Sequence, residues 1–173
     1  EEVDWGTFTA LIQDFKTNKI KFEQKDVEFP TLYSQRAINI ITSKYFKGQL
    51  GNENREWKHL PVVDFEPSPK REWSYKQLLD RVVATNVKWG REQGYFKTEK
   101  DAEIFGDELT YILLHQKAYF NSPVWFNMGF PNRPATASAC FVNSIEDSME
   151  SILEFIKTEG LIFRAGSGSG ANI

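Results

Sequence analysis

Residues 138–144 read SACFVNS, and the residues after them show helical periodicity from about Asp147 to Phe163. The first stretch is a short apolar run of the kind that forms a buried strand. In the second stretch, acidic residues crowd the start and Arg164 follows the end, which is the charge distribution that the helix dipole favours. We therefore predict that residues 121–173 open an α/β fold with one strand and one helix, and that its other strands are absent.

A glycine-rich run, Gly166 to Gly170 (GSGSG), follows this predicted helix. Phosphate-binding loops normally precede a helix, and the P-loop also carries a lysine, so the run matches neither pattern. Taken alone, it predicts a helix C-cap with a flexible turn, or an engineered linker. Its remaining functional use is close approach of the backbone to a ligand, because glycine lacks the Cβ that would block it.

Three N-cap residues precede apolar residues at helical spacing, which predicts a mainly helical region in the middle of the chain. Ser34 starts the first helix. Ser74 and Thr98 start the other two, each with a glutamine or aspartate three residues later that completes a capping box. The predicted helices are, in chain order, residues 35–46, 75 to about 90, and 98 to about 120.

The first 30 residues are less regular. Thr7–Lys16 are predicted as a short helix or as the remnant of an upstream domain, and alternating apolar residues over 19–29 indicate a small hairpin. Residues 51–72 contain prolines among scattered charges, which predicts a surface loop or linker. The expected organisation is an N-terminal segment (1–30), a helical domain (31–120) and the start of an α/β domain (121–173).

The composition is that of an ordinary globular domain. Hydrophobic residues make up 40% and charged residues 26% of the 173 residues, which does not indicate intrinsic disorder. The formal net charge of −3 argues against nucleic acid as a partner. No apolar run approaches the ~18–20 residues of a membrane span. With one cysteine and two histidines, we expect no intramolecular disulfide, no metal site and no membrane partner, as for a cytoplasmic protein.

Cys140 is the only thiol of the chain. Lone cysteines are among the most buried residues and usually act as small hydrophobes, which is the plain interpretation here. The small side chains of Ser138 and Ala139 beside it leave room for a ligand, so a functional role stays open.

Asn121–Asn127 (NSPVWFN) are expected at a helix end. They form either a turn that two aromatic residues anchor in the core, or a loop whose backbone N–H groups and Ser122 hydroxyl face an anion. Asp147 and Ser148 are explained by capping of the last helix, and His115 by an ordinary core or surface position. Composition and spacing therefore indicate a mostly helical, incomplete domain and assign no reaction.

Several motifs, taken in order, nevertheless resemble one family. They are KYF (44–46), WG and GYF (89–96), FNSPVWFN (120–127), SACF (138–141), EDSM (146–149), SI (151–152) and GSGSG (166–170). In order and spacing they are similar to the N-terminal part of the class II, adenosylcobalamin-dependent ribonucleotide reductases. The similarity runs from about Val27 to the end and is weakest over 51–72. A class I reductase fragment shares these active-site parts and stays open, although NSPVWFN and GSGSG favour class II.

The resemblance implies a fold and a chemistry. It makes the first part a mainly α N-terminal domain that leads into the first strand-helix unit of the ten-stranded α/β barrel of ribonucleotide reductases. Cys140 matches a redox cysteine that reduces the 2′ carbon of ribose and becomes disulfide-bonded to a cysteine on a later strand. In a reducing cell such a disulfide is transient and catalytic, and a thioredoxin-type reductant would reopen it.

The resemblance also places the substrate site. Ser122, Val124, Ser138, Ala139 and Gly166 match positions that line the ribose and phosphates of a ribonucleotide, by resemblance a diphosphate. In this setting, the glycine-rich turn would offer backbone amides to phosphate oxygens.

A second nucleotide site is implied at the last helix. Asp147 and Ser148 match the start of a helix that holds a deoxynucleotide specificity effector, and Arg164 contributes at its end. That helix also resembles one used for dimerisation. A homodimer would place the effector at the subunit boundary, where it can bias the choice of substrate.

The chain begins at Glu1 and stops at Ile173, and we expect an N-terminal piece that works with a C-terminal half, in the same or a separate chain. The radical cysteine, the partner of Cys140 and most adenosylcobalamin contacts should lie in that half, so we expect this chain to be inactive by itself. The alternative is a non-catalytic remnant that binds nucleotides or another protein through the helix faces it exposes.

Overall fold

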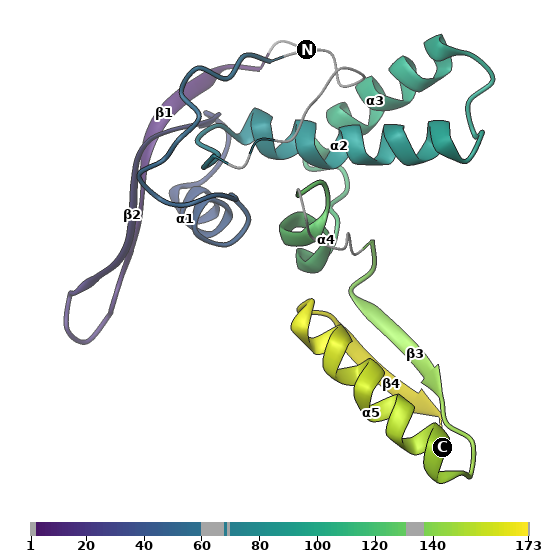
Figure 1. The fold of residues 1–173 in the computed structure, drawn as a ribbon. Helices are drawn as coiled ribbons and strands as arrows, with labels where there is room; N and C mark the ends of the chain where they lie inside the picture. The colour runs from purple at the N-terminus through teal and green to yellow at the C-terminus, as the bar shows by residue number, and fades with distance from the viewer. Residues whose placement is uncertain (1–2, 60–67, 69, 131–136, 173) are drawn as a thin grey trace. The chain divides into compact units, whose positions relative to one another are not determined.

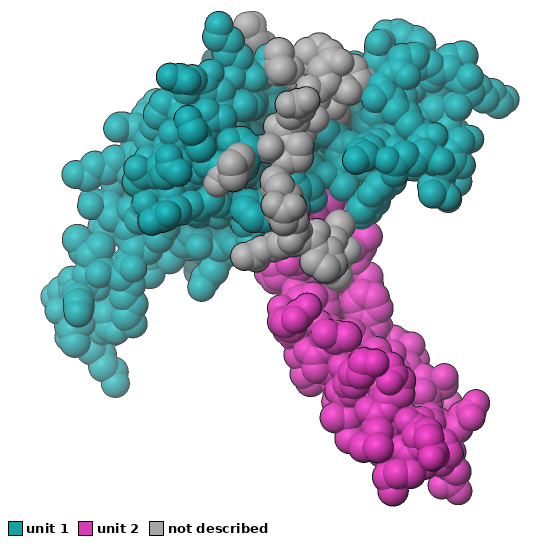
Figure 2. Space-filling view, viewed as in Figure 1, with its two compact units in different colours: residues 1–119, 129–132 teal, residues 120–128, 133–173 magenta. Residues whose placement is uncertain are grey.

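The computed structural model describes residues 3–59, 68, 70–130 and 137–172. The chain forms two compact units, which are Glu1–Tyr119 with Gly129–Asn132, and Phe120–Met128 with Arg133–Ile173. Figure 2 shows the first unit in teal and the second in magenta. Among the helices that the structure describes, none is long and apolar enough to cross a membrane.

The first unit begins with a long antiparallel hairpin (Figure 1), in which strand β1 (Trp5–Gln13) pairs with strand β2 (Ile20–Pro30). The helix predicted over Thr7–Lys16 is therefore wrong. Residues 19–29 are also not a hairpin by themselves, because they form one strand of this larger one. The threonines, phenylalanine and isoleucine of β1 favour a strand, and pairing with β2 outweighs the helix-like spacing of its apolar residues.

In the described part of the first unit three helices follow the hairpin, and they begin where the capping signals predict. They are α1 (Gln35–Lys44), α2 (Tyr75–Glu92) and α3 (Glu99–Leu114). Ser34, Ser74 and Thr98 each accept a hydrogen bond from a backbone N–H of the first turn, and the last two form reciprocal capping boxes. Helix α3 ends well before the predicted Phe120, and Gln116 just beyond it has a positive φ of 55°.

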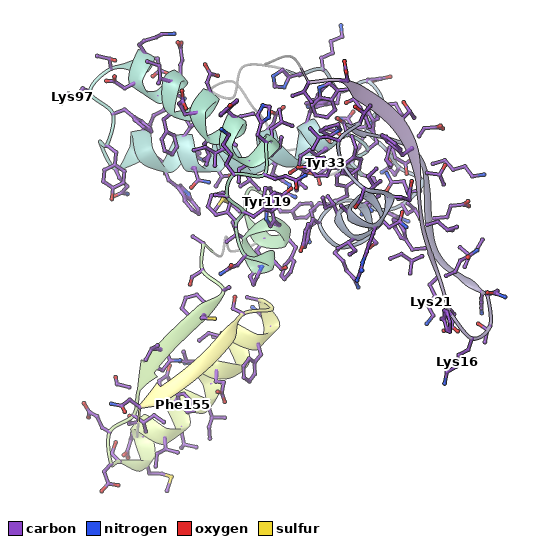
Figure 3. All side chains as sticks on the ribbon, turned by 180° about the vertical axis from the view of Figure 1, so that it is seen from behind. Lys16, Lys21, Tyr33, Lys97, Tyr119 and Phe155 are labelled. Carbon is purple, nitrogen blue, oxygen red and sulfur yellow. The ribbon has the colours of Figure 1, made fainter. Side chains whose placement is uncertain are left out.

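The core of the first unit is rich in aromatic rings. Phe29 on β2 stacks on Phe46 and on Tyr75, with ring centroids 5.5 and 5.3 Å apart. The hydroxyls of Tyr33 and Tyr119 lie 2.9 Å apart (Figure 3), and both also bond to the hydroxyl of Tyr75. Burial raises the pKa of Tyr75 well above its usual range. The hydrogen bonds among the three hydroxyls connect α2 to the chain on either side of it.

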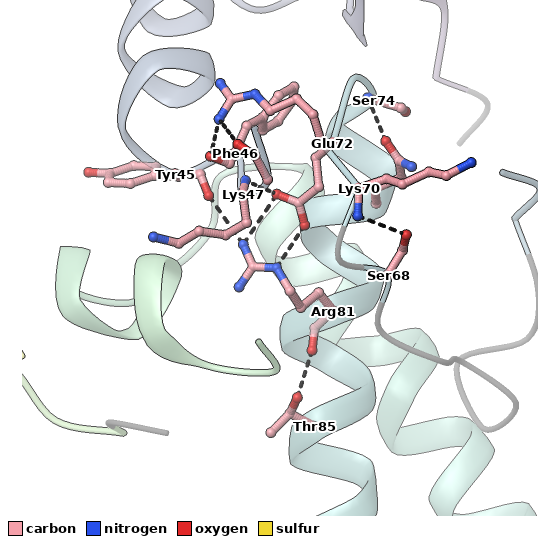
Figure 4. Close-up of polar contacts among 12 residues, drawn as sticks. Tyr45, Phe46, Lys47, Ser68, Lys70, Glu72, Ser74, Arg81 and Thr85 are labelled. Atoms are coloured by element: carbon pink, nitrogen blue, oxygen red, sulfur yellow. Dashed lines mark hydrogen bonds and ion pairs between the residues drawn. The ribbon is translucent and has the colours of Figure 1, made fainter. Parts of the chain in front are cut away.

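A buried polar network lies beside this core (Figure 4). The Nε of Arg81 lies 2.7 Å from Oε1 of Glu72, and the same carboxylate accepts a 2.8 Å hydrogen bond from the backbone N–H of Lys47. The guanidinium of Arg71 donates to two backbone carbonyls at and just after the end of α1, at 2.7 and 2.6 Å. Each charge is therefore matched by an opposite charge or by hydrogen bonds, as burial requires.

The surface loop predicted over 51–72 is wrong at the end of that stretch. Arg71 and Glu72 are only 6% and 7% exposed, because the network just described satisfies their charges. Residues 60–67 and 69 lie outside the described residues, so the prediction there stays a prediction.

The second unit contains a strand-helix-strand motif. Its elements are a short helix α4 (Ser122–Asn127), strand β3 (Cys140–Ser144), helix α5 (Met149–Arg164) and strand β4 (Gly168–Asn172). Strands β3 and β4 are parallel neighbours. The predicted strand and helix are confirmed. The flexible turn predicted over GSGSG is wrong from Gly168 onward, because these residues form the parallel strand that the sequence did not reveal. The complete barrel stays a prediction.

Apolar side chains of the second unit are unusually exposed. Val142 on β3 is 86% exposed, and no residue of α5 is buried. Met149, Leu153 and Ile156 on α5 are each more than half exposed. The buried strand predicted from the sequence is therefore wrong for this chain, because one helix can cover only one face of two strands.

Candidate functional site

The candidate site is centred on Cys140, the first residue of β3, whose side chain is exposed. The interpretation of this cysteine as a buried small hydrophobe is therefore wrong. A Cβ built on Gly168 of the neighbouring strand would lie 3.7 Å from the Cys140 Sγ and 3.6 Å from the carbonyl oxygen of Ala139. These are ordinary van der Waals distances, so a side chain at position 168 would lie against the thiol, and glycine leaves this side of Cys140 uncovered.

The backbone before Cys140 is held by consecutive hydrogen bonds. The Gly168 N–H donates to the carbonyl of Ala139 at 2.6 Å, and the Ser167 hydroxyl donates to the carbonyl of Ser138 at 3.1 Å. The Ser138 hydroxyl in turn donates to the carbonyl of Cys140 at 2.9 Å. The predicted residues Ser138, Ala139 and Cys140 therefore form one ordered segment against the start of β4.

Gly166 forms the turn between α5 and β4. Its φ of +80° lies in the left-handed region, and a Cβ at this position would come within 2.9–3.0 Å of the Phe126 ring. The Asn127 side chain donates to the carbonyl of Ala165 at 2.7 Å. These contacts bring the end of α4 against the turn. Within the second unit, Gly166 therefore lies close to the segment that carries Cys140.

The amides of this turn are already used within the chain. The N–H groups of Gly166 and Ser167 donate to the carbonyls of Phe163 and Ile162, at 2.9 and 3.2 Å. The Gly168 amide is bonded to Ala139. The amides of Gly166, Ser167 and Gly168 are thus bonded within the chain, and the phosphate cradle stays a prediction.

Helix α4 carries the other two predicted substrate residues. Ser122 is exposed at its first position, whereas Val124 is buried at 3% exposure, next to the buried Trp125. The Trp125 indole N–H donates to the carbonyl of Phe120 at 2.9 Å. Of the two aromatic residues expected in the core, Trp125 is buried and Phe126 only partly so, and the segment is a helix rather than a turn. The side chain of Ser122 is exposed, whereas the backbone N–H of Val124 donates to the carbonyl of Asn121 and its carbonyl accepts from the N–H of Met128.

The predicted effector residues do not come together within one chain. Ser148 caps α5 and accepts a hydrogen bond from the backbone N–H of Ser151 at 3.2 Å, with Asp147 just before it. Arg164 is the last residue of the same 16-residue helix. At 1.5 Å per residue the helix is roughly 24 Å long. Arg164 therefore lies at the Gly166 end of α5, and Asp147 and Ser148 at the opposite end.

Two polar residues of this site were not predicted. Asn127 and Ser167 are uncharged residues with no distinctive spacing. Each belongs to a motif in which the sequence analysis singled out a different residue. The alternation of serine with glycine in GSGSG is the only signal that could have pointed to Ser167. No group of three histidine, cysteine, aspartate or glutamate side chains that could hold a metal ion occurs within the described ranges.

Comparison with known proteins gives a consistent family. Residues 8–116 match the family model of class II vitamin B12-dependent ribonucleotide reductases. The whole chain is 47% identical to the vitamin B12-dependent ribonucleotide reductase of Streptomyces coelicolor, of which it covers 16%. The protein of the same name from Rhodopirellula baltica is 35% identical over 98% of this chain, and the match covers 17% of that protein. The chain thus spans about one sixth of the length of these curated relatives.

Proposed function

The chain belongs to the class II vitamin B12-dependent ribonucleotide reductases, and on that premise we propose that it forms the N-terminal part of such an enzyme and supplies one redox cysteine. The class I interpretation is thereby set aside. The substrate is a ribonucleotide, which we propose to be a diphosphate. The observation that carries the proposal is the position of Cys140, exposed at the start of a strand and open on the side of Gly168.

In the proposed reaction Cys140 works with a second cysteine from the rest of the enzyme. The two thiols give up two hydrogen atoms and join as a disulfide. The ribose loses its 2′ hydroxyl as water and gains hydrogen at that carbon. An external thioredoxin-type dithiol then reduces the disulfide by exchange. Such a cysteine must reach both a substrate and another thiol, which the open side of Cys140 allows.

The substrate cradle is proposed to combine Ser122 on α4, the segment Ser138–Ala139 and the Gly166 turn. The contacts of Phe126 and Asn127 with that turn support this, because they place the end of α4 beside the chain that leads to Cys140. Since the turn amides are bonded internally, the proposed contribution of Gly166 is the space left by its missing side chain.

Cobalamin, in its adenosyl form, would supply the radical that starts the reaction. The residues of the second unit that the structure describes do not fit a corrin ring. Their hydroxyl and amide side chains around Cys140 bond to the chain itself, and both histidines stand in the first unit, where His59 is bonded to Asp80. We assign the cofactor to the rest of the enzyme.

The effector site is proposed to form between two copies of the chain. Asp147 and Ser148 stand at one end of α5 and Arg164 at the other. Antiparallel pairing of two such helices would bring the acidic start of one helix near the arginine of the other. The exposed apolar residues Met149 and Ile156 of α5 support its use as the dimer surface.

The test uses the full-length enzyme with Cys140→Ser. We expect multi-turnover reduction to be abolished while the deoxynucleotide effector still binds as in the wild type. Val142→Ala, on the same strand with an exposed side chain, is the matched control and should keep its activity. Undiminished turnover of Cys140→Ser would contradict the catalytic role.

The exposed apolar surface of α5 also favours a second candidate, a non-catalytic module that binds a nucleotide or another protein. It predicts that the chain is isolated from its source as a separate 20.0 kDa species that binds a deoxynucleotide. Native mass spectrometry of the protein from its own source distinguishes the two, because the reductase predicts Cys140 in a longer chain or in a complex with a second cysteine-bearing chain.

A further inference from the structure

Two serines alternate with glycine in the GSGSG run, and their surroundings differ. Ser167 is 5% exposed, and its hydroxyl donates to the carbonyl of Ser138. Ser169 is only partly buried, and its hydroxyl accepts a hydrogen bond from the Asn143 side chain at 3.0 Å. The first serine thus contacts the backbone just before Cys140, and the second contacts a side chain further along β3.

Ser167 connects three segments of the second unit. Its backbone N–H bonds to Ile162 in the last turn of α5, and its hydroxyl bonds to Ser138. It also stands between the Gly166 turn and Gly168, whose amide bonds to the next residue of the same segment, Ala139. The helix end, the turn and the start of β3 are therefore fixed to one another at this residue.

We propose that Ser167 is a positioning residue of the redox site: its buried hydroxyl fixes the Ser138–Ala139 backbone and so sets the direction in which the Cys140 thiol projects. The inference rests on the proposed function of Cys140. Ser167 does not contact the substrate itself, because its hydroxyl is buried and bonded to Ser138.

Two consecutive hydrogen bonds define an orientation that one bond cannot. With Ser167 in place, the carbonyls of Ser138 and Ala139 are both held by the start of β4. Without its hydroxyl, the carbonyl of Ser138 loses its contact with the residues that lead into β4, and the bond from Gly168 holds this segment at Ala139 alone. A cysteine that must meet both a ribose carbon and a second thiol loses rate when it is misplaced by even 1 Å, by about 100-fold.

The test compares Ser167→Ala with Ser169→Ala in the full-length reductase. For Ser167→Ala we expect kcat to fall about 10-fold to 100-fold, while the affinity for the deoxynucleotide effector changes less than about threefold. Amide hydrogen exchange at Gly168 should accelerate about fivefold, the loss expected for one hydrogen bond. Ser169→Ala loses a comparable bond and should keep its kcat within about twofold.

A second pair of variants separates the hydroxyl from the shape of the side chain. Ser167→Thr keeps the hydroxyl and Ser167→Val replaces it with a methyl group of similar size. We expect Ser167→Thr to exceed Ser167→Val in kcat by about tenfold. This comparison also serves if Ser167→Ala does not fold.

The proposal is overturned if Ser167→Ala keeps wild-type kcat, if both alanine variants lose activity equally, or if Ser167→Thr and Ser167→Val have the same rate. Failure of the proposed function gives a different result. In that case Cys140→Ser remains active, while the exchange rate at Gly168 still reports whether Ser167 holds the strand.

Discussion

The two units of the chain differ in how completely they bury their own side chains. In the first, Phe29 and Tyr75 are fully buried and the charges of Glu72 and Arg81 are paired inside the fold. In the second, the longest helix has no buried residue and the candidate cysteine is exposed. The difference teaches that a chain can complete one core by itself while it leaves the unit that carries its candidate site largely exposed.

The largest effect should come from the aromatic core of the first unit. Phe29→Ala is expected to lower the free energy of unfolding by about 3–5 kcal/mol, because it removes a buried ring and leaves a cavity. The matched variant in the second unit is Ile156→Ala, whose side chain is 58% exposed and should change stability by no more than about 0.5 kcal/mol. Urea denaturation followed by circular dichroism measures both. Equal losses of stability in the two variants would contradict the difference in burial between the units.

The buried ion pair should come next. Arg81→Ala leaves the Glu72 carboxylate buried without its charged partner and should cost about 3 kcal/mol. Lys157→Ala breaks an ion pair with Glu154 on the exposed surface of α5, where the side chains are 67% and 64% exposed, and should cost less than about 0.5 kcal/mol. The same denaturation experiment compares them. A small cost for Arg81→Ala would mean that water reaches the network.

The turn of the candidate site offers a smaller but sharper contrast. Gly166→Ala forces a left-handed residue and a contact with Phe126, and should destabilise the second unit by about 1–2 kcal/mol. Gly160→Ala lies in α5 with no neighbouring atom within 4 Å and should stabilise the helix by about 0.5–1 kcal/mol. Thermal unfolding measured at 222 nm should therefore shift in opposite directions. Shifts of the same sign would contradict the turn geometry.

The smallest expected effect depends on pH. The hydrogen bond to Asp80 raises the pKa of His59 above its usual 6.5, and burial raises the pKa of Asp80. A raised histidine pKa gives stability that is fully present below about pH 6.5 and is lost as pH rises through the folded-state value. Since His59 is half-exposed, the loss should stay below about 1 kcal/mol.

Two measurements check this prediction. An NMR titration should give His59 a midpoint above that of an unstructured peptide, and His59→Asn should flatten the decline in stability between about pH 6 and 8. A wild-type stability that rises over this range would contradict the sign.

Side chains that act locally made the helices predictable. Ser34, Ser74 and Thr98 cap their helices through contacts within the first turn, so the sequence alone locates these starts. Strand β1 was not predictable in the same way because its pairing with β2 is a long-range interaction. Strand β4 (GSGAN) was hidden by its composition, since glycine and serine are poor strand formers and only the parallel contact with β3 makes it a strand.

The residues of the candidate site also differ in how well the sequence alone could identify them. Cys140 and Gly166 could be identified by motif resemblance, because motifs record residue types at fixed spacing. The roles of Ser167 and Asn127 could not, because each depends on a carbonyl group far along the chain, at Ser138 and Ala165. The exposure of Cys140 was also unpredictable, since a short apolar strand normally lies inside a fold.

The most direct test of the central claim is the oxidation state of Cys140 after one turnover. The full-length enzyme is prereduced, freed of reductant, given its ribonucleotide and cobalamin, quenched with an alkylating agent and analysed by mass spectrometry of the peptide that carries Cys140. We predict that Cys140 is disulfide-bonded to a second cysteine in proportion to the deoxynucleotide formed. Deoxynucleotide formed with Cys140 still alkylated as a free thiol would contradict the account.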